Sequence, residues 1–221
     1  MNLFDLKEPI AYLAVATTIL QFLSGILVCK QYVANKTTAE ASSFPFIAGV
    51  LSCGIWLLYG LTKRNDKIVT VNTIGLVLMI SYSVIFYFYT FKKSAVLRQC
   101  TFTIIFFLIL LGYISVEEDN ENLVIRLGSL ASSFTIVTVA APLSKLLHVI
   151  RVKSTECLPF PMILMSLFVS AFWYLYGYID QDLFVAVPNF IGMVLAMVQL
   201  VLFLIFPSTS HSSKQCKSTI A

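Results

Sequence analysis

Two asparagines, Asn72 and Asn189, stand 117 residues apart in stretches of the chain that are otherwise apolar. A tryptophan precedes each of them, and Trp56 and Trp173 are again 117 residues apart. A carboxamide both donates hydrogen bonds to hydroxyl groups and accepts them, and an indole can cover the C–H face of a sugar ring. The four residues are therefore candidate binding groups for a polar molecule with apolar faces. The alternative is that each asparagine only makes a helix–helix hydrogen bond, which is common in membranes.

These residues belong to a cassette that occurs twice at the same offset. The first copy reads WLLYG at residues 56–60 and VNTIG at 71–75, and the second reads WYLYG at 173–177 and PNFIG at 188–192. Upstream, KTT at 36–38 matches KST at 153–155, also 117 residues apart. A self-match at one fixed offset indicates an internal duplication.

The composition is that of an integral membrane protein. Hydrophobic residues make up 58% of the chain and charged residues 12%, against roughly a quarter charged in soluble domains. A spanning helix needs about 20 apolar residues, whereas a transmembrane barrel would show short alternating strands. Seven stretches meet the helical requirement or nearly so, the fourth being short: Ile10–Val28, Phe44–Leu61, Ile68–Phe91, Thr101–Val116, Leu127–Ile150, Leu158–Ile179 and Leu183–Phe206.

The duplication and the seven spans together predict an all-α fold of two parallel three-helix repeats joined by one inversion helix (3+1+3). Three spans end on the opposite side of the membrane from where they began, so a second triple in the same orientation needs one additional crossing. The predicted boundaries are residues 1–96 for the first triple, 97–122 for the linker helix, and 123–206 for the second triple. Residues 207–221, rich in Ser, Thr and Lys, are predicted to be a disordered cytosolic tail.

Lysine and arginine in the loops predict the orientation, because they are enriched on the cytosolic side. With the N-terminus outside, the cytosolic side receives ten of them and the outer side five. The N-terminus is therefore predicted to be extracellular or lumenal and the C-terminus cytosolic. Asn35 begins a formal glycosylation sequence that this topology places in the cytosol, where we expect it to remain unmodified.

Several classes of function are disfavoured. The chain contains no Walker loop, zinc signature or nucleophile–base arrangement, so we expect neither an enzyme nor a cofactor. Its net charge of +4 is explained by the topology and does not indicate nucleic-acid binding. No Asp or Glu falls deep within any predicted span. Because ion- or proton-coupled carriers usually need a titratable group there, the sequence favours facilitated transport without coupling.

The chain closely resembles the SWEET (nodulin/saliva) sugar transporters, and within them the insect saliva-like members. The resemblance covers about residues 10–206 and rests on the two Trp-x-x-Tyr-Gly and Asn-x-x-Gly cassettes, the two Lys-Ser/Thr-Thr segments and Ala141-Pro142-Leu143. It implies two three-helix bundles plus an inversion helix, and bidirectional sugar uniport across the plasma membrane, a Golgi membrane or both. The expected partners are a small sugar and membrane lipid, with homo-oligomerisation possible.

The resemblance also implies roles for individual residues. A central pocket would be formed by Trp56, Asn72, Trp173 and Asn189; an outer gate by Tyr59 and Asp182; and inner-gate hinges by Gly25, Pro45, Pro142 and Pro161. Gly25 departs from the family pattern, in which a proline is expected. Trp56 stands where many plant members have a small residue. Two indoles leave less room, which favours a monosaccharide such as a hexose over sucrose.

Three other classes of protein are alternatives. A seven-span receptor shares the predicted topology, but it would not contain a 117-residue repeat. A proton-coupled carrier of the PQ-loop type would show Pro-Gln dipeptides and buried acids, and this chain has neither. A purely structural membrane protein would leave the paired asparagines unexplained.

Overall fold

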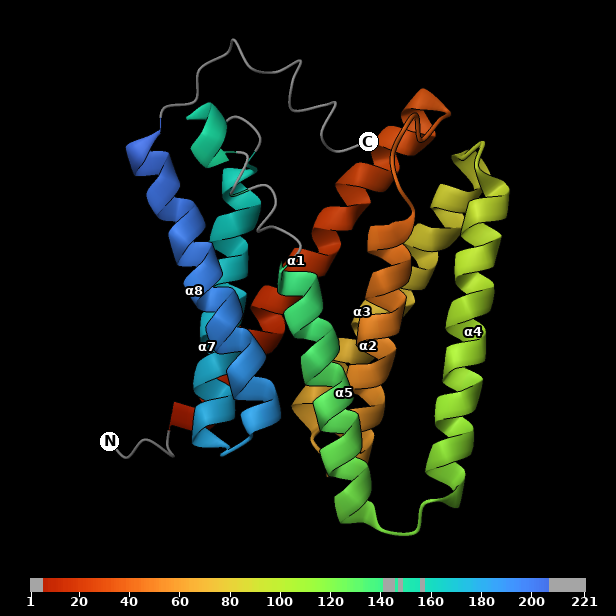
Figure 1. The fold of residues 1–221 in the computed structure, drawn as a ribbon, viewed down its shortest axis with the longest axis vertical. Helices are drawn as coiled ribbons and strands as arrows, with labels where there is room; N and C mark the ends of the chain where they lie inside the picture. Colours follow the sequence, from red (N-terminus) through yellow and green to blue (C-terminus); the bar gives the residue numbers. More distant parts are fainter. Residues whose placement is uncertain (1–5, 141–145, 147–148, 156–157, 207–221) are drawn as a thin grey trace. The chain divides into compact units, whose positions relative to one another are not determined.

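The computed structural model describes residues 6–140, 146, 149–155 and 158–206. Within these residues, seven helices are long and apolar enough to cross a membrane (Figure 1). They are α1 (Lys7–Asn35), α2 (Phe44–Lys63), α3 (Asp66–Tyr89), α4 (Lys93–Val116), α5 (Asn120–Ala140), α7 (Phe160–Ile179) and α8 (Leu183–Ile205).

Each of the seven predicted spans coincides with one of these helices, but the fourth is longer than the sequence indicated. The prediction of a short span beginning at Thr101 was wrong, because α4 begins at Lys93 and has 24 residues. Its first turns contain Lys93 and Arg98, whose long side chains can keep their charge in water while the stem lies along apolar surface. Part of the predicted fifth span, including Pro142, and the predicted tail lie outside the described residues.

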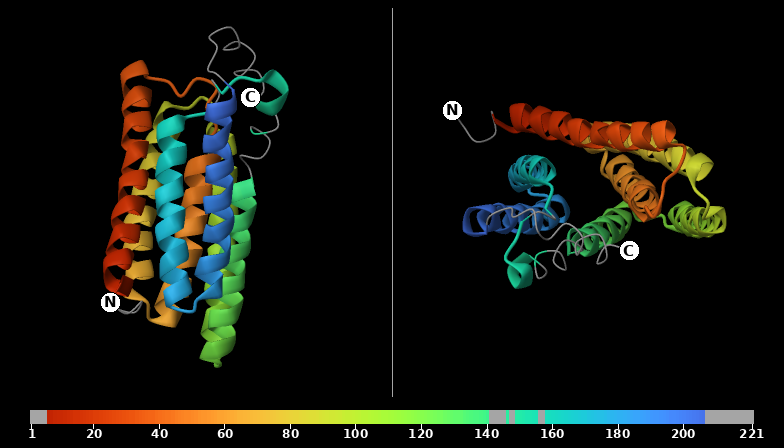
Figure 2. Two further views of the ribbon diagram at one scale, coloured as in Figure 1. Left: turned by 90° about the vertical axis from the view of Figure 1, so that its left-hand side faces the viewer. Right: turned by 90° about the horizontal axis from the view of Figure 1, so that it is seen from above.

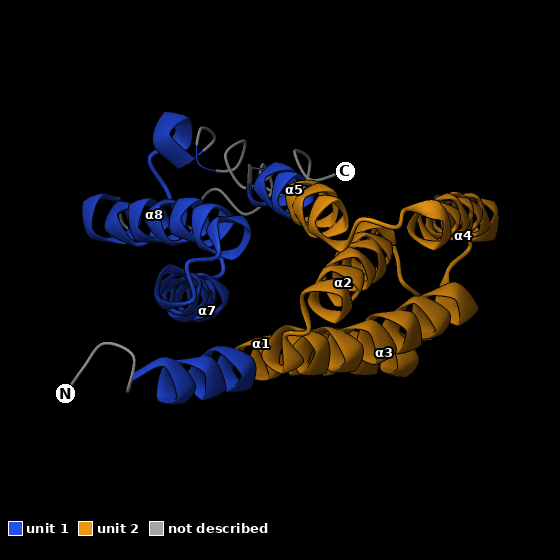
Figure 3. Cartoon of the chain, turned by 90° about the horizontal axis from the view of Figure 1, so that it is seen from below, with its two compact units in different colours: residues 1–17, 132–221 blue, residues 18–131 orange. Residues whose placement is uncertain are grey.

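The chain divides into two compact units, drawn in Figure 3. Unit 1 comprises residues 1–17 and 132–221, and unit 2 comprises residues 18–131, so the division falls within α1 and within α5. Each unit contains one antiparallel helical hairpin, α7–α8 in unit 1 and α2–α3 in unit 2 (Figures 1 and 2). The boundaries predicted at residues 96, 122 and 206 separate the sequence repeats, whereas the two units are defined by packing. The predicted boundaries therefore stay a prediction.

The turn of the first hairpin satisfies backbone groups that a helix end leaves unpaired. Arg64 adopts a left-handed conformation with φ of 58°, which lets the chain reverse at once. The backbone N–H of Asn65 then donates to the carbonyl of Gly60 at 2.9 Å. The side chain of Asn65 accepts from the backbone N–H of Ile68 at 3.2 Å and so caps α3.

The second hairpin repeats this turn residue by residue, with every number 117 higher. Gln181 is left-handed with φ of 54°, and the N–H of Asp182 donates to the carbonyl of Gly177 at 2.8 Å. The carboxylate of Asp182 accepts from the N–H of Val185 at 3.2 Å and caps α8. The duplication inferred from the sequence is therefore present in the hydrogen bonding of the backbone.

At the opposite ends of the hairpins, a second pair of contacts joins equivalent residues through different donor groups. The backbone N–H of Thr38 donates to the carbonyl of Tyr89, the last residue of α3, at 3.2 Å. Thr155, 117 residues later, donates its hydroxyl to the carbonyl of Phe206 at the end of α8, also at 3.2 Å. In both units the loop that precedes a hairpin is thus tied to the hairpin's last helix.

The inversion helix α4 packs against α2. Near one end of the contact, the hydroxyl of Ser43 donates to the side-chain oxygen of Gln99 at 2.7 Å. Further along, the ring of Phe107 lies where a Cβ atom on Gly54 would stand. A glycine in α2 therefore lets the aromatic side chain of α4 approach the backbone.

Close approach of the two helices differs between the hairpins. A Cβ on Gly177 would lie 2.8 Å from the backbone nitrogen of Ala186, whereas a Cβ on Gly60 would lie 2.9 Å from the side-chain Cγ2 of Ile68. The side chain of Ile68 can shift slightly within its rotamer, whereas the backbone of a packed helix cannot move alone. The α7–α8 contact is therefore the less tolerant of added volume.

We expect Gly177→Ala to lower the free energy of unfolding by about 1–3 kcal/mol, as overpacking typically does, and Gly60→Ala to lower it less. The measurement is thermal unfolding of the purified protein in detergent. Gly112→Ala is the matched control, because a Cβ there meets no atom within 4 Å and alanine favours a helix over glycine by roughly 0.5–1 kcal/mol. Equal stabilities of the Gly177 and Gly112 variants would contradict the conclusion that the α7–α8 contact at Gly177 tolerates little added volume.

Candidate functional site

The two asparagines occupy the same place in their hairpins. Asn72 is the seventh residue of α3 and Asn189 the seventh of α8, about 9 Å along the axis from the first residue of the helix. The side-chain nitrogen of Asn72 donates to the carbonyl of Ile68 at 2.9 Å. That of Asn189 donates to the carbonyl of Val185 at 2.8 Å. Both carboxamides are half-buried.

These bonds fix which way each carboxamide faces. If the amide were rotated by 180°, its oxygen would lie beside a backbone carbonyl oxygen, and two acceptors repel each other. The oxygens of Asn72 and Asn189 are thus directed away from the helix carbonyls. Within the described residues, neither side-chain oxygen accepts a hydrogen bond. Each asparagine therefore presents an acceptor, with its orientation fixed in advance, to a hydroxyl donor.

Each tryptophan of the cassette packs against the tyrosine one turn further along its helix. The rings of Trp56 and Tyr59 have centroids 5.5 Å apart and planes at 84°. Those of Trp173 and Tyr176 are 5.6 Å apart at 87°. Edge-to-face contacts of this kind are favourable, and both tyrosines are buried. The indoles are consequently oriented alike in the two units.

The two residues predicted to form the outer gate lie near hairpin turns. Tyr59 is fully buried near the end of α2, and Asp182 is 3% exposed at the N-cap of α8. A carboxylate at a helix N-terminus is stabilised by the helix dipole. Asn65 holds the equivalent position in the first hairpin. Tyr59 and Asp182 belong to different units, so their pairing across a gate stays a prediction.

Of the predicted inner-gate hinges, Pro45 and Pro161 are each the second residue of their helix, α2 and α7. Proline is well tolerated there because the first N–H groups of a helix have no intrahelical partner. Pro142 lies outside the described residues. Gly25 lies inside α1, which is helical on both sides of it.

The structure explains why residue 25 is not a proline. The ring of Tyr82 lies where a Cβ on Gly25 would stand, and the Tyr82 hydroxyl donates to the carbonyl of Phe22 at 3.0 Å. The aromatic side chain from α3 thus fills the space that a proline ring would need. Glycine is the residue that accommodates it.

Pro188 is a residue near the site whose significance the sequence reasoning missed. It is buried within α8, directly before Asn189. Because proline has no N–H, it cannot donate the usual helix bond to the carbonyl of Phe184, four residues earlier. The first hairpin has Val71 at this position. A single proline inside an apolar span, beside one of the paired asparagines, was the available signal.

Comparison with known proteins identifies the family. The family described as "Sugar efflux transporter for intercellular exchange" matches residues 8–94 and 125–211. The chain is 40% identical to "Sugar transporter SWEET1" of Drosophila pseudoobscura pseudoobscura, covering 95% of this chain and 94% of that protein. It is 31% identical to "Bidirectional sugar transporter SWEET1" of Arabidopsis thaliana, covering 86% and 79% of the two chains. Identity to the human "Sugar transporter SWEET1" is 31%, covering 87% and 88%.

A solved structure of a eukaryotic SWEET transporter superposes with a TM-score of 0.81 at 27% identity, covering 92% of this chain and 98% of that one. The fold is therefore that of a multi-pass membrane protein of two parallel helical triples joined by an inversion helix, as predicted. The chain belongs to the SWEET family of sugar transporters.

We expect Gly25→Pro to destabilise the protein by more than the roughly 3 kcal/mol that proline costs inside a helix, because its ring would also collide with Tyr82. In a Tyr82→Ala background only the intrinsic cost should remain. Thermal unfolding of the two single variants and the double variant gives the coupling free energy between residues 25 and 82, which we expect at about 1–3 kcal/mol. Strict additivity would show that Tyr82 is not what excludes proline.

Proposed function

We propose that this protein mediates bidirectional, uncoupled transport of sugars, with monosaccharides favoured, by alternating access across a membrane. Asn72 and Asn189 would accept hydrogen bonds from sugar hydroxyls. The observation that carries the proposal is the matched orientation of the two carboxamides, each held by the carbonyl four residues earlier. If the two asparagines only packed helices together, there would be no reason for both side-chain oxygens to face away from the helix carbonyls without a donor among the described residues.

The tryptophans support the same substrate class. An indole held at a fixed angle by a buried tyrosine presents a rigid apolar face, which suits the C–H side of a pyranose ring. With an indole in each copy, Trp56 and Trp173, the site would be narrower than one with a small residue at either position. This is the reason to favour hexoses over disaccharides.

The acidic residues favour transport without proton coupling. In the part of the chain that the structure describes, every Asp and Glu lies in a loop or in the first turn of a helix: Glu8, Glu40, Asp66, Glu117, Glu118, Asp119, Glu121, Asp180 and Asp182. A carboxylate far from the helix ends, which could carry a proton through the membrane, is not among them.

The remaining parts of the proposal concern placement. The excess of Lys and Arg in the loops on one side supports an outside N-terminus and a cytosolic C-terminus. The membrane would be the plasma membrane, a Golgi membrane or both. Tyr59 and Asp182 would form the outer gate. Gly25, Pro45, Pro142 and Pro161 would serve the inner gate.

We expect Asn72→Ala and Asn189→Ala each to weaken sugar binding roughly ten- to hundredfold, because a sugar hydroxyl left without its partner costs about 1–3 kcal/mol. The two effects should be similar in size, since the residues have equivalent geometry. The measurement is the concentration dependence of hexose uptake by proteoliposomes, normalised to the amount of protein.

Thr73→Ala is the matched control. Its hydroxyl donates to the carbonyl of Val69 at 2.8 Å, which is the same bond to the residue four earlier, but its side chain is exposed. We expect near-normal uptake. Wild-type affinity in both asparagine variants, with reduced stability alone, would show that the two residues only hold helices together.

Flux should follow the sugar gradient alone. In proteoliposomes that contain only this protein, uptake should be unchanged by a protonophore and should stop when internal and external concentrations are equal. Accumulation of sugar against its gradient, driven by an imposed pH difference, would refute uncoupled transport.

A further inference from the structure

A close ion pair joins the beginning of α1 to the end of α7. The ammonium of Lys7, the first residue of α1, lies 2.6 Å from a carboxylate oxygen of Asp180, which directly follows α7. The two side chains are 34% and 17% exposed. Both residues belong to unit 1, although 173 positions separate them in the chain.

Each of these charges is unfavourable for its own helix. Lys7 places a positive charge at the N-terminus of α1, where the helix dipole is already positive. Asp180 caps the C-terminus of α7, where the dipole is negative, with its N–H donating to the carbonyl of Tyr176 at 2.9 Å. Helix stability therefore explains neither residue, whereas the ion pair between them offsets the unfavourable interaction of each charge with its helix dipole.

The duplication did not supply this pair. The equivalent of Asp180 in the first hairpin is Lys63, and the equivalent of Lys7 in the second triple is Val124. Lys63 has the charge that a helix C-terminus favours, and it lies 5.9 Å from the centre of the Tyr59 ring. The two hairpins share their turn geometry but carry opposite charges at this point, so the Lys7–Asp180 ion pair has no counterpart at the equivalent positions of the first hairpin.

The pair connects the two repeats. α1 is the first helix of the first triple and α7 the second helix of the second triple, and the joined ends lie on the side predicted to be outside. We propose that Lys7–Asp180 is an outer latch, which holds the outer ends of α1 and α7 together and must break when the transporter opens outward. This inference rests on the alternating access proposed above.

The size of the effect follows from the exposure of the pair. Ion pairs that remain in contact with water typically shift an equilibrium by about two- to fivefold and are weakened by salt. Removing the latch should therefore raise the ratio of outward-open to outward-closed molecules by that factor. Such a change redistributes conformations without preventing either of them.

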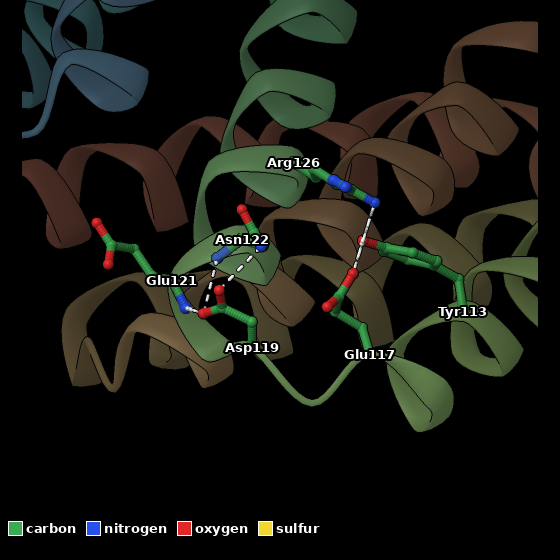
Figure 4. A network of polar contacts seen from close by, with 6 residues as sticks. All are labelled: Tyr113, Glu117, Asp119, Glu121, Asn122 and Arg126. Carbon is green, nitrogen blue, oxygen red and sulfur yellow. Dashed lines mark hydrogen bonds and ion pairs between the residues drawn. The ribbon is translucent and has the colours of Figure 1, made fainter.

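A second outer polar network offers a matched control (Figure 4). The hydroxyl of Tyr113 donates to Glu117 at 2.9 Å, and the guanidinium of Arg126 donates to the Tyr113 hydroxyl at 2.7 Å. Arg126 also lies 3.5 Å from the Glu117 carboxylate. Asp119, which lies between Glu117 and Arg126 in the sequence, accepts hydrogen bonds from the backbone N–H groups of Glu121 and Asn122. This network joins the consecutive helices α4 and α5, so it should support the loop without opposing the movement of one triple against the other.

The experiment uses the full chain in lipid nanodiscs, with spin labels at cysteines replacing Leu13 on α1 and Leu183 on α8, both exposed. The label-to-label distance distribution is measured for the parent protein, Lys7→Gln, Asp180→Asn, the exchanged pair Lys7→Asp with Asp180→Lys, and Arg126→Gln. In the exchanged pair each charge also suits its helix dipole, so the protein should fold at least as well. Uptake of hexose by the same variants is measured in parallel.

If the latch exists, each single variant raises the longer-distance population about two- to fivefold, the exchanged pair returns it to the parent value, and Arg126→Gln leaves it unchanged. High salt should produce the same shift in the parent and none in Lys7→Gln. Parent-like distributions in both single variants, or no recovery in the exchanged pair, would overturn the latch. Failure of the parent to transport sugar would count against the proposed function instead, because the distances are read without substrate.

Discussion

A chain that reverses direction between two adjacent helices must pair the backbone groups that the helix ends leave without an intrahelical partner, and this requirement determines how both hairpins turn. In both hairpins the reversal needs one left-handed residue, one bond back to a glycine carbonyl and one side-chain cap on the next helix. All three features recur at the 117-residue offset, although among the residues that form them only the glycine, Gly60 and Gly177, is identical in the two copies. The turn geometry is therefore repeated even where the side chains differ.

On this shared turn the two hairpins carry different side chains. The first has Lys63, Asn65 and Val71 where the second has Asp180, Asp182 and Pro188. These differences do not alter the turn, since the left-handed residue and the glycine bond are present in both. The duplicated hairpins are therefore equivalent supports with different charges and different helix regularity.

The sequence predicted the fold, and it placed the candidate site residues at equivalent positions of the two hairpins, because both depend on spacing. Apolar length indicates a spanning helix, and the recurrence of Trp, Tyr, Gly and Asn at one offset places the same groups at the same depth in each hairpin. It placed the start of α4 eight residues too late, because Lys93 and Arg98 interrupt the apolar window without interrupting the helix. It could not find contacts between side chains from distant helices. The ring of Tyr82 beside Gly25 and the pairing of Lys7 with Asp180 leave no periodic trace, since each depends on tertiary packing.

The glycine contacts give the two hairpins unequal mechanical compliance. In the first, Gly60 faces the side chain of Ile68, which can shift slightly within its rotamer; in the second, Gly177 faces the peptide backbone of α8. A small displacement of α2 against α3 can therefore be taken up by side-chain movement, whereas the same displacement of α7 against α8 has to move a helix backbone. The second hairpin, in which Pro188 and Asn189 are adjacent, is therefore the stiffer of the two.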